Sequence, residues 1–251
     1  MFRCEELKSG KIYLGDCMEV MKGMGDRSVD VCFTSPPYND KGTKGDYDED
    51  GNIKKGDNSS HTKYKWVDYR SDWLEWQISV IDEMLRVSKK WVLYNVQGIK
   101  NIRQDVYKII GHYADRIHDI CIWSKPSGVP CGNPHKISNR YEFLIILKCD
   151  GVKGVDVQSD FYTNVIKCKQ NHNNEYSNIH KALMSKEFCD EVIREFTAPG
   201  DTVLDPFFGL GTTGLSCTQL GRKFVGTEIF EEYFEGAIKR INECTAKEQL
   251  W

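Results

Sequence analysis

The stretch that decides the fold is residues 203–214, which reads VLDPFFGLGTTG. Its apolar start predicts a strand that delivers Asp205 to its carboxyl end, and Thr212 and Thr213 open the next helix. Between them, Gly209 and Gly211 let the backbone turn tightly and leave room for a ligand against it. A strand, a glycine-rich turn and a helix in this order are typical of α/β proteins, whose ligands bind at the carboxyl ends of the strands.

Strands and helices alternate along most of the remaining chain. Apolar runs predict strands at residues 11–14, 29–33, 90–96, 118–125, 141–149, 201–207 and 223–229. Helical patterns follow at residues 72–88, 99–113, 185–197, 209–221 and 231–245. This alternation predicts a largely parallel, doubly wound sheet.

Two of the predicted helices indicate which face they bury. The apolar stripe of the helix at 72–88 consists of Leu74, Ile78, Ile81 and Leu85. The helix at 185–197 begins with Ser185 as its cap and should direct Phe188, Val192, Ile193 and Phe196 inward.

Composition limits the class of protein. The 251 residues suffice for one large α/β domain or for a domain with a modest insertion. A net charge of -3 argues against a basic nucleic-acid coat protein but leaves a local basic face open. No apolar run is long enough to span a bilayer, so we expect no membrane partner.

The ten cysteines contain no CxxC pair and are interpreted as reduced thiols of a cytoplasmic protein. The spacing of Cys121, Cys131 and His135 fits no usual zinc pattern, and we expect no metal.

The strand that follows the glycine-rich turn and its helix favours a nucleoside as the bound ligand. Glu228 lies at the end of the strand that follows Asp205, where a carboxylate can accept hydrogen bonds from both ribose hydroxyls. The chain has no GxxxxGK[ST] motif, and Asp205 at the turn would repel a pyrophosphate. A cationic, phosphate-free nucleoside such as S-adenosylmethionine therefore suits this turn better than NAD. A purely structural connection is the alternative for a glycine-rich turn that stands alone.

A second unusual stretch is residues 34–39, TSPPYN, which follows the predicted strand at 29–33. Pro36 and Pro37 have restricted φ angles and no backbone N–H, so their carbonyls can be held outward as acceptors. Ser35 adds a hydroxyl oxygen, and Tyr38 offers a flat face. Together they form a slot for a planar group that carries an NH2, stacked on Tyr38 with its hydrogens directed at the Ser35 hydroxyl and the Pro36 carbonyl.

Such a slot has a chemical purpose. The exocyclic amine of a nucleobase is a poor nucleophile, because its lone pair is delocalised into the ring. Acceptors placed out of the ring plane favour a more tetrahedral nitrogen, which can then attack a sulfonium methyl in line. The alternative is a proline-stiffened loop with a core tyrosine. The functional interpretation requires folding to bring residues 35–38 and the glycine-rich turn into one cavity.

These two motifs resemble those of the DNA amino-methyltransferases, which methylate cytosine N4 or adenine N6. SPPY at residues 35–38 is similar to the family's (D/N/S)PP(Y/F/W), and DPFFGLGTT at 205–213 to its cofactor motif. The catalytic motif comes first, which is the permuted order of the β-type members. The resemblance implies a doubly wound, mostly parallel seven-stranded sheet of the S-adenosylmethionine-dependent, Rossmann-like type with a small inserted target-recognition region.

The resemblance also implies domain bounds. Residues 1–124 and 185–251 would form the catalytic and cofactor-binding domain, with a mobile polar loop at about 40–70. Residues 125–184 would form the recognition region, whose small size suggests a short target or reliance on a second subunit.

The implied cofactor site extends beyond the glycine-rich turn. Asp16 would accept from the adenine amino group, and the segment at 180–185 would contact the methionine end. The further residues implied by the resemblance are Cys17, Thr34, His180, Lys181, Ser185, Phe207, Phe208 and Ile229.

The implied partner is double-stranded DNA with the target base flipped into the Tyr38 slot. Side chains expected to hold phosphates or to stack are Lys63, Lys65, Trp66, Tyr69, Arg70, Lys125, Lys136 and Arg140. A homodimer and a cognate restriction endonuclease remain open, and the source would be bacterial, archaeal or phage-encoded.

The target base and two rival classes stay open at this point. Serine at position 35 favours cytosine N4, since members that act on adenine more often carry Asp or Asn there; adenine N6 is the alternative. Less favoured are a protein glutamine methyltransferase, which usually has the opposite motif order and Asn at the first motif position, and a DNA-binding module without catalytic activity.

Overall fold

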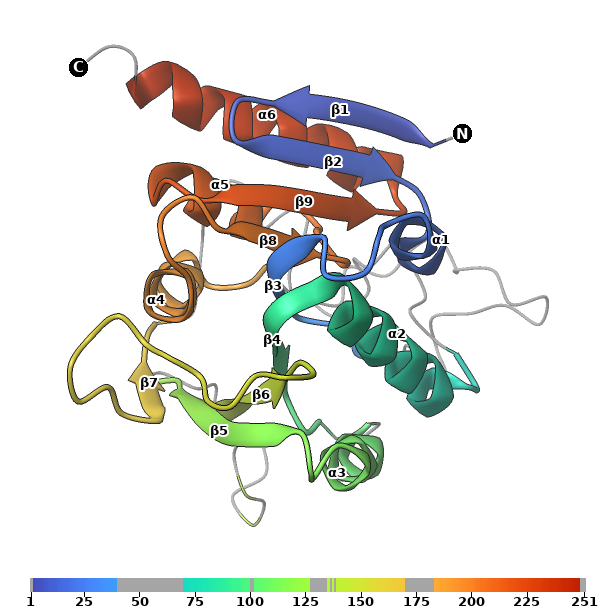
Figure 1. The fold of residues 1–251 in the computed structure, drawn as a ribbon, viewed down its shortest axis with the longest axis vertical. Coiled ribbons are helices and arrows are strands. Elements are labelled where there is room, and N and C mark those ends of the chain that lie inside the picture. Colours follow the sequence, from blue (N-terminus) through green and yellow to red (C-terminus); the bar gives the residue numbers. More distant parts are fainter. Residues whose placement is uncertain are drawn as a thin grey trace.

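The computed structural model describes residues 2–39, 70–99, 102–126, 135, 137, 139–169 and 183–248. Within this part, a single sheet has the strand order β1-β2-β9-β8-β3-β4-β6-β5-β7 (Figure 1). The strands are β1 (Arg3–Leu7), β2 (Gly10–Leu14), β3 (Val29–Thr34), β4 (Ser88–Val96), β5 (Ile117–Ser124), β6 (Tyr141–Lys148), β7 (Val165–Lys167), β8 (Thr202–Asp205) and β9 (Lys223–Glu228). Only β1 and β6 run against the others, so the prediction of a mostly parallel sheet is confirmed.

The expectation of seven strands is wrong, because the sheet has nine. One unpredicted strand is β1, whose sequence RCEEL has no apolar run because much of it faces solvent at the sheet edge. It is held there by pairing with β2 and by ion pairs from Arg3 to Glu231 and Glu235. The other is β7, whose three residues are too few to show a period.

Among the described residues, six helices cover the two faces of the sheet. One face carries α1 (Cys17–Lys22), α2 (Trp73–Val87) and α3 (Arg103–His112) over one apolar cluster. The other carries α4 (Lys186–Phe196), α5 (Thr212–Gln219) and α6 (Glu231–Glu248) over a second cluster (Figure 1). No described helix is both long and apolar enough to cross a membrane.

The helix faces were predicted with unequal success. In α4, the inward-facing residues are as expected, and the Ser185 hydroxyl accepts from the backbone N–H of Phe188 as the N-cap. In α2, Ile81 is buried, but Leu74, Ile78 and Leu85 are only partly buried. The fully buried stripe is displaced around the helix and consists of Trp73, Gln77, Val80, Ile81, Met84 and Val87.

The strand order positions the site. From β3 the chain crosses to its neighbour β4 on one side, whereas from β8 it crosses to β9 on the other. The boundary between the paired strands β3 and β8 is therefore the topological switch point of the sheet, where ligands bind at the carboxyl ends of the strands. Cys32 pairs with Leu204 across this junction, so the turns that follow the two strands start side by side.

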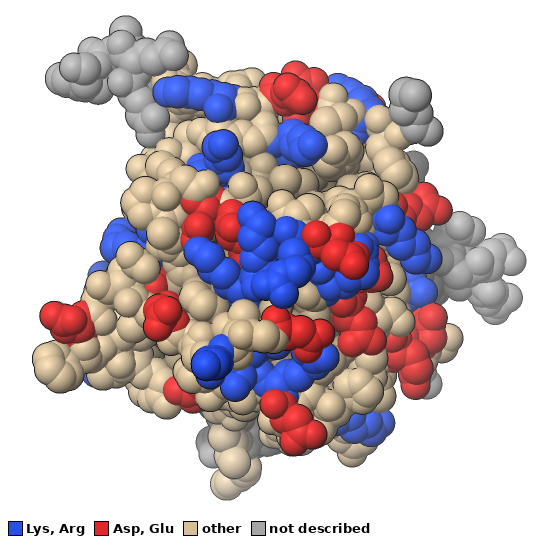
Figure 2. All heavy atoms as spheres, viewed as in Figure 1, with Lys and Arg blue, Asp and Glu red and all other residues tan. Residues whose placement is uncertain are grey.

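The opposite end of the sheet is rich in paired charges. Figure 2 shows Lys and Arg side chains gathered in the middle of the viewed face, interleaved with Asp and Glu. Near the amino ends of β3, β4 and β5, the ion pairs are Arg86–Asp26, Lys89–Asp30, Lys90–Asp201 and Arg116–Asp150. Because these cations already have carboxylate partners and lie away from the switch point, they do not form a ready phosphate-binding surface.

Candidate functional site

A buried hydrogen-bond network joins the turn at residues 35–38, after β3, to the glycine-rich turn after β8. The Thr34 hydroxyl donates to Asp205 Oδ1 at 2.6 Å, and the Thr213 hydroxyl donates to Asp205 Oδ2 at 2.7 Å. The backbone N–H of Phe207 also donates to Oδ1, at 3.0 Å. Asp205 therefore connects the strand that precedes residues 35–38 to the turn and helix of the glycine-rich motif.

Burial governs the protonation of this carboxyl group. Desolvation raises the pKa of Asp205 to about 6, against the lowering effect of its hydrogen bonds from Thr34, Thr213 and Phe207. Both carboxylate oxygens are used within the protein, so Asp205 acts on a ligand mainly by shaping the turn.

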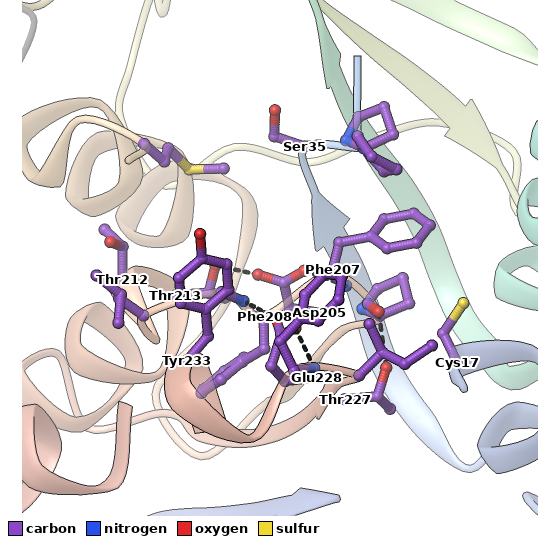
Figure 3. A pocket seen from close by; sticks show the side chains of 18 of the residues that line it. Cys17, Ser35, Asp205, Phe207, Phe208, Thr212, Thr213, Thr227, Glu228 and Tyr233 are labelled. Atoms are coloured by element: carbon purple, nitrogen blue, oxygen red, sulfur yellow. Dashed lines mark hydrogen bonds between the residues drawn. The ribbon is translucent and has the colours of Figure 1, made fainter. Parts of the chain in front are cut away.

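One cavity of about 340 Å³ lies at the switch point and contains both motifs (Figure 3). The predicted site residues that line it are Asp16, Cys17, Ser35, Pro36, Pro37, Tyr38, Arg70, Asp205, Phe207, Phe208, Gly209, Thr212, Thr213, Glu228 and Ile229. The prediction that residues 35–38 and the glycine-rich turn share one cavity is thus confirmed. The roles of the individual side chains remain predictions.

Three predicted cofactor residues lie behind the cavity wall. Thr34 is fully buried and is engaged with Asp205. Gly211 has a left-handed φ of 72° at the start of α5, where a Cβ would lie 3.0 Å from the Phe208 ring. The Ser185 hydroxyl donates to the Lys169 carbonyl at 2.6 Å and caps α4, so the expectation of a direct cofactor contact is not supported; Leu183 and Met184 line the cavity instead.

The turn at residues 35–38, called the SPPY corner below, is held by hydrogen bonds to residues that do not line the cavity. The indole N–H of the buried Trp73 donates to the Pro37 carbonyl at 2.9 Å. The phenol of Tyr38 donates to Glu142 Oε2 at 3.4 Å. Burial, followed by the negative charge of Glu142, raises the pKa of Tyr38 well above its usual value, so the phenol stays protonated.

The glycine-rich turn is held by Glu228. Its two carboxylate oxygens accept from the backbone N–H groups of Gly209 at 2.8 Å and of Phe230 at 2.9 Å. Burial raises the pKa of Glu228 to about 7 against these hydrogen bonds. The carboxylate oxygens retain further lone pairs for ligand hydroxyl donors.

At the β2 end of the cavity, Asp16 is the N-cap of α1. Its Oδ1 accepts from the backbone N–H groups of Met18 at 2.8 Å and of Glu19 at 3.2 Å. Both of these hydrogen bonds use the same carboxylate oxygen, Oδ1. Burial raises the pKa of the neighbouring Cys17 thiol to about 12, so this cavity-lining cysteine is not a nucleophile near neutral pH.

Of the predicted DNA contacts, five lie outside the described residues, two are found at the cavity or on the surface, and Lys125 is buried. Lys63, Lys65, Trp66, Tyr69 and Lys136 lie outside the described residues, as do the cofactor candidates His180 and Lys181 and most of the expected 40–70 loop. Arg70 lies at the cavity with its guanidinium 4.5 Å from the Trp76 ring centre and 3.1 Å from Asp72, and Arg140 is exposed.

Lys125 requires a correction. Its side chain is 4% exposed and is paired with Glu142, so it does not present a charge to a phosphate. The resemblance implied a phosphate contact for Lys125 at the end of a predicted strand; in the structure Lys125 directly follows β5, and its backbone N–H donates to the carbonyl of Arg140, just before β6.

Sequence patterns did not single out several residues of the cavity wall. Trp76 contacts Phe207 edge to face with ring centres 5.5 Å apart, and Met184 and Tyr233 also line the cavity. Each looks like an ordinary core residue in the sequence, because an apolar residue in a ligand wall shows the same helical spacing as one in the core.

Comparison with known proteins identifies the family of the chain. The model of the DNA methylase family of N6 and N4 methyltransferases matches residues 29–240. Two curated relatives are the type II methyltransferase M.HinfI of Haemophilus influenzae, 27% identical over 92% of this chain and 68% of its own length, and M.BamHI of Bacillus amyloliquefaciens, 28% identical over 88% of this chain. The match covers 54% of M.BamHI, about half of that protein.

Solved structures share the fold. The PvuII DNA methyltransferase, named as cytosine-N4-specific, has a TM-score of 0.68 at 16% identity, with 94% of this chain and 91% of that chain covered. M1.HpyAVI in complex with SAM has a TM-score of 0.61 at 21% identity, with 92% and 99% covered.

A doubly wound sheet with a cavity at its switch point is characteristic of the Rossmann-like class of α/β proteins, whose ligands bind at this edge of the sheet. Within that class, the chain belongs to the DNA methylase family of N6 and N4 methyltransferases.

Proposed function

We propose that this protein transfers a methyl group from S-adenosylmethionine to the exocyclic amine of a base in double-stranded DNA, with cytosine N4 favoured. The observation that carries the proposal is the shared cavity, in which residues 35–38 lie opposite the glycine-rich turn, with Asp205 linking the two. A donor and an acceptor bound to these two walls would meet in one cavity, as a transfer between two bound groups requires.

The charge of the cavity fits this cofactor. Three carboxylate residues line it, namely Asp16, Asp205 and Glu228. Arg70, a described cation that also lines it, is paired with Asp72. Such a lining suits a cationic nucleoside without phosphates and disfavours a pyrophosphate.

The cofactor would be held by Asp16 at the adenine, by Glu228 at the ribose and by the backbone of the glycine-rich turn. When bound, S-adenosylmethionine supplies an electrophilic sulfonium methyl group. The ring of Tyr38 would stack on the flipped base, and Ser35 with the Pro36 carbonyl would accept the amino hydrogens. The Trp73 bond to the Pro37 carbonyl keeps the SPPY corner in place.

The preference for cytosine rests on Ser35. Its neutral hydroxyl is a weaker acceptor than the carboxylate of an aspartate at this position. We propose that it serves cytosine N4, and adenine N6 is the second candidate within the same family.

Target recognition is proposed for residues 125–184, with Arg70 and Arg140 as phosphate contacts. This stretch is not a separate unit, because β6 and β7 lie within the sheet. Within this stretch, the amino end of β6 pairs beside the carboxyl end of β4, the strand next to β3, so it lies at the same edge of the sheet as residues 35–38.

The test uses purified protein, methyl-labelled S-adenosylmethionine and whole-genome-amplified DNA, which carries no methyl groups. We expect label on the DNA, and mass spectrometry of its nucleosides should find N4-methylcytosine. N6-methyladenine instead would assign the second candidate. Label on protein alone, or cofactor binding without transfer, would contradict the proposal.

Tyr38→Ala tests whether base stacking and cofactor binding use different walls of the cavity. Stacking of a base on an aromatic ring contributes about 1–3 kcal/mol, so transfer should fall by about 5- to 150-fold. Cofactor affinity, measured by calorimetry, should stay near the wild-type value. A large loss of that affinity would contradict the stacking role.

A further inference from the structure

A buried ion pair lies directly behind Tyr38. Glu142 is 6% exposed and Lys125 is 4% exposed, and the ammonium group of Lys125 contacts Glu142 Oε1. The other oxygen, Oε2, accepts from the Tyr38 phenol. One carboxylate thus connects a buried cation to the aromatic residue of the proposed base slot.

The antiparallel pairing of β5 and β6 places these groups. Glu142 is opposite Trp123 in the register, and the backbone N–H of Lys125 donates to the Arg140 carbonyl at 2.9 Å. The Lys125 ammonium group lies 4.8 Å from the Trp123 ring centre. Because β6 also pairs with β4, and β4 with β3, Glu142 arrives at the carboxyl edge of the sheet next to the turn that carries Tyr38.

Stability alone is a weak reason for such a pair. Removing two charges from water costs several kcal/mol per ion, and well-packed apolar residues often serve as well or better. What apolar residues would not supply is an acceptor of fixed direction for the phenol. Lys125 holds one carboxylate oxygen, and this leaves the other aimed at Tyr38.

We propose that Glu142 and Lys125 are positioning residues that hold the ring of Tyr38 in the orientation on which the target base stacks; this inference rests on the proposed function. Tyr38 is then held at both ends. Trp73 holds the carbonyl of the preceding Pro37, and Glu142 accepts from the phenol at the far end of the ring, where the Ser35 side chain and the Gln97 backbone also hydrogen-bond to it. Neither Glu142 nor Lys125 lines the cavity, so both act through Tyr38.

The experiment is a double-mutant cycle between Glu142→Gln and Tyr38→Phe in the full-length protein. Its probes are whole-genome-amplified DNA and labelled S-adenosylmethionine, and the readouts are kcat, cofactor Kd and the unfolding midpoint. In Glu142→Gln, the amide oxygen is drawn to Lys125 and its NH2 group replaces the acceptor for the phenol. We expect kcat to fall about 5- to 10-fold, as loss of one oriented hydrogen bond predicts, with cofactor Kd unchanged.

Tyr38→Phe should cause a similar loss, because it removes the phenol and keeps the ring. The double variant should be no slower than either single variant. The matched control is Glu195→Gln, a carboxylate that is 3% exposed and accepts from Ser159 at 2.8 Å, outside the cavity. It should leave kcat unchanged.

The outcomes separate this inference from the proposed function. Wild-type transfer to DNA supports the proposed function whatever the variants do. Glu142→Gln at the wild-type rate would overturn the inference, and so would fully additive losses in the cycle. Should Glu142→Gln fail to fold because Lys125 lacks its counter-charge, Lys125→Met with Glu142→Leu removes both charges together. That variant should show the same loss, and wild-type kcat from it would overturn the inference.

Discussion

At the scale of single residues, the site depends on buried carboxylates that accept hydrogen bonds from the protein's own donors. Asp205 accepts hydrogen bonds from Thr34 and Thr213, which come from opposite ends of the sequence. Glu228 accepts from the backbone of the turn that it faces. Burial raises the pKa of both carboxyl groups, so their ionisation in the folded protein is costly.

Thr34→Val tests the bond that fastens the two turns. Valine has nearly the same shape, so the change removes the hydroxyl donor and leaves Asp205 Oδ1 buried with one partner fewer. We expect a loss of about 1–3 kcal/mol in the free energy of unfolding, measured by urea titration. Thr163→Val, at an exposed threonine, is the control and should change little. Equal stability of the two variants would show that the bond contributes nothing.

Glu228→Gln tests the ionisation of the second carboxyl group. Its pKa is about 7 in the folded protein and near 4.5 when exposed, so the unfolded chain loses this proton first as pH rises. The wild type should therefore lose stability relative to Glu228→Gln between about pH 4.5 and 7, by on the order of 3 kcal/mol. Unfolding at several pH values measures the difference between the two proteins. A difference that stays constant with pH would contradict the raised pKa.

At the scale of elements, glycines let the glycine-rich turn approach its neighbours. The Phe208 ring packs against β9 and α5, where a Cβ on Gly226 or Gly214 would lie 2.5 Å from a ring carbon. The ring also stacks on Phe224 with centres 5.6 Å apart. The sequence pattern explains Gly209 and Gly211 as turn residues, but the reasons for Gly214 and Gly226 are visible only once β9 and α5 are packed on the turn.

Gly226→Ala should displace Phe208 and distort the turn. Overpacking of this kind costs about 1–3 kcal/mol of stability, and cofactor affinity should fall as well. Gly111→Ala in α3 is the matched comparison, since nothing lies within 4 Å of its Cβ position. It should stabilise the protein by about 0.5–1 kcal/mol through helix propensity. Thermal unfolding and calorimetry distinguish the two, and opposite signs are the expected result.

At the scale of the whole molecule, the cavity joins segments from both ends of the chain. Elements near the amino terminus supply Asp16 and Tyr38, and elements near the carboxyl terminus supply Phe207 and Glu228. Of the neighbouring residues in the turn, Phe207 packs against the apolar cluster on one face of the sheet and Phe208 belongs to the cluster on the other. A ligand bound here should therefore stabilise the fold as a unit.

S-adenosylmethionine at 100 times its Kd should raise the free energy of unfolding by about 2.7 kcal/mol. The shift of the thermal midpoint with ligand concentration measures this. NAD at the same concentration is the control, and it should give no shift because its pyrophosphate meets the carboxylates of the cavity. Equal shifts from both ligands would contradict the assignment of a phosphate-free nucleoside.

Local pattern determined much about this protein by itself. The alternation of strands and helices, the turn at 205–213 and the SPPY corner depend on residues adjacent in sequence, so the parallel sheet and both motifs were predictable. The edge strand β1 was not, because a solvent-facing strand lacks an apolar run. Nor was the buried stripe of α2, because its two candidate faces differ little in apolar content.

Only the tertiary structure decided which distant groups meet. Pairing of β3 with β8 brings Thr34 to Asp205, and pairing of β5 with β6 buries Lys125 against Glu142 beside Tyr38. A charged residue has the same identity in a sequence whether it faces solvent or a buried partner. Its role is set by the desolvation and the partner that folding imposes, which is why Lys125 looked like a phosphate contact and is instead buried behind the proposed base slot.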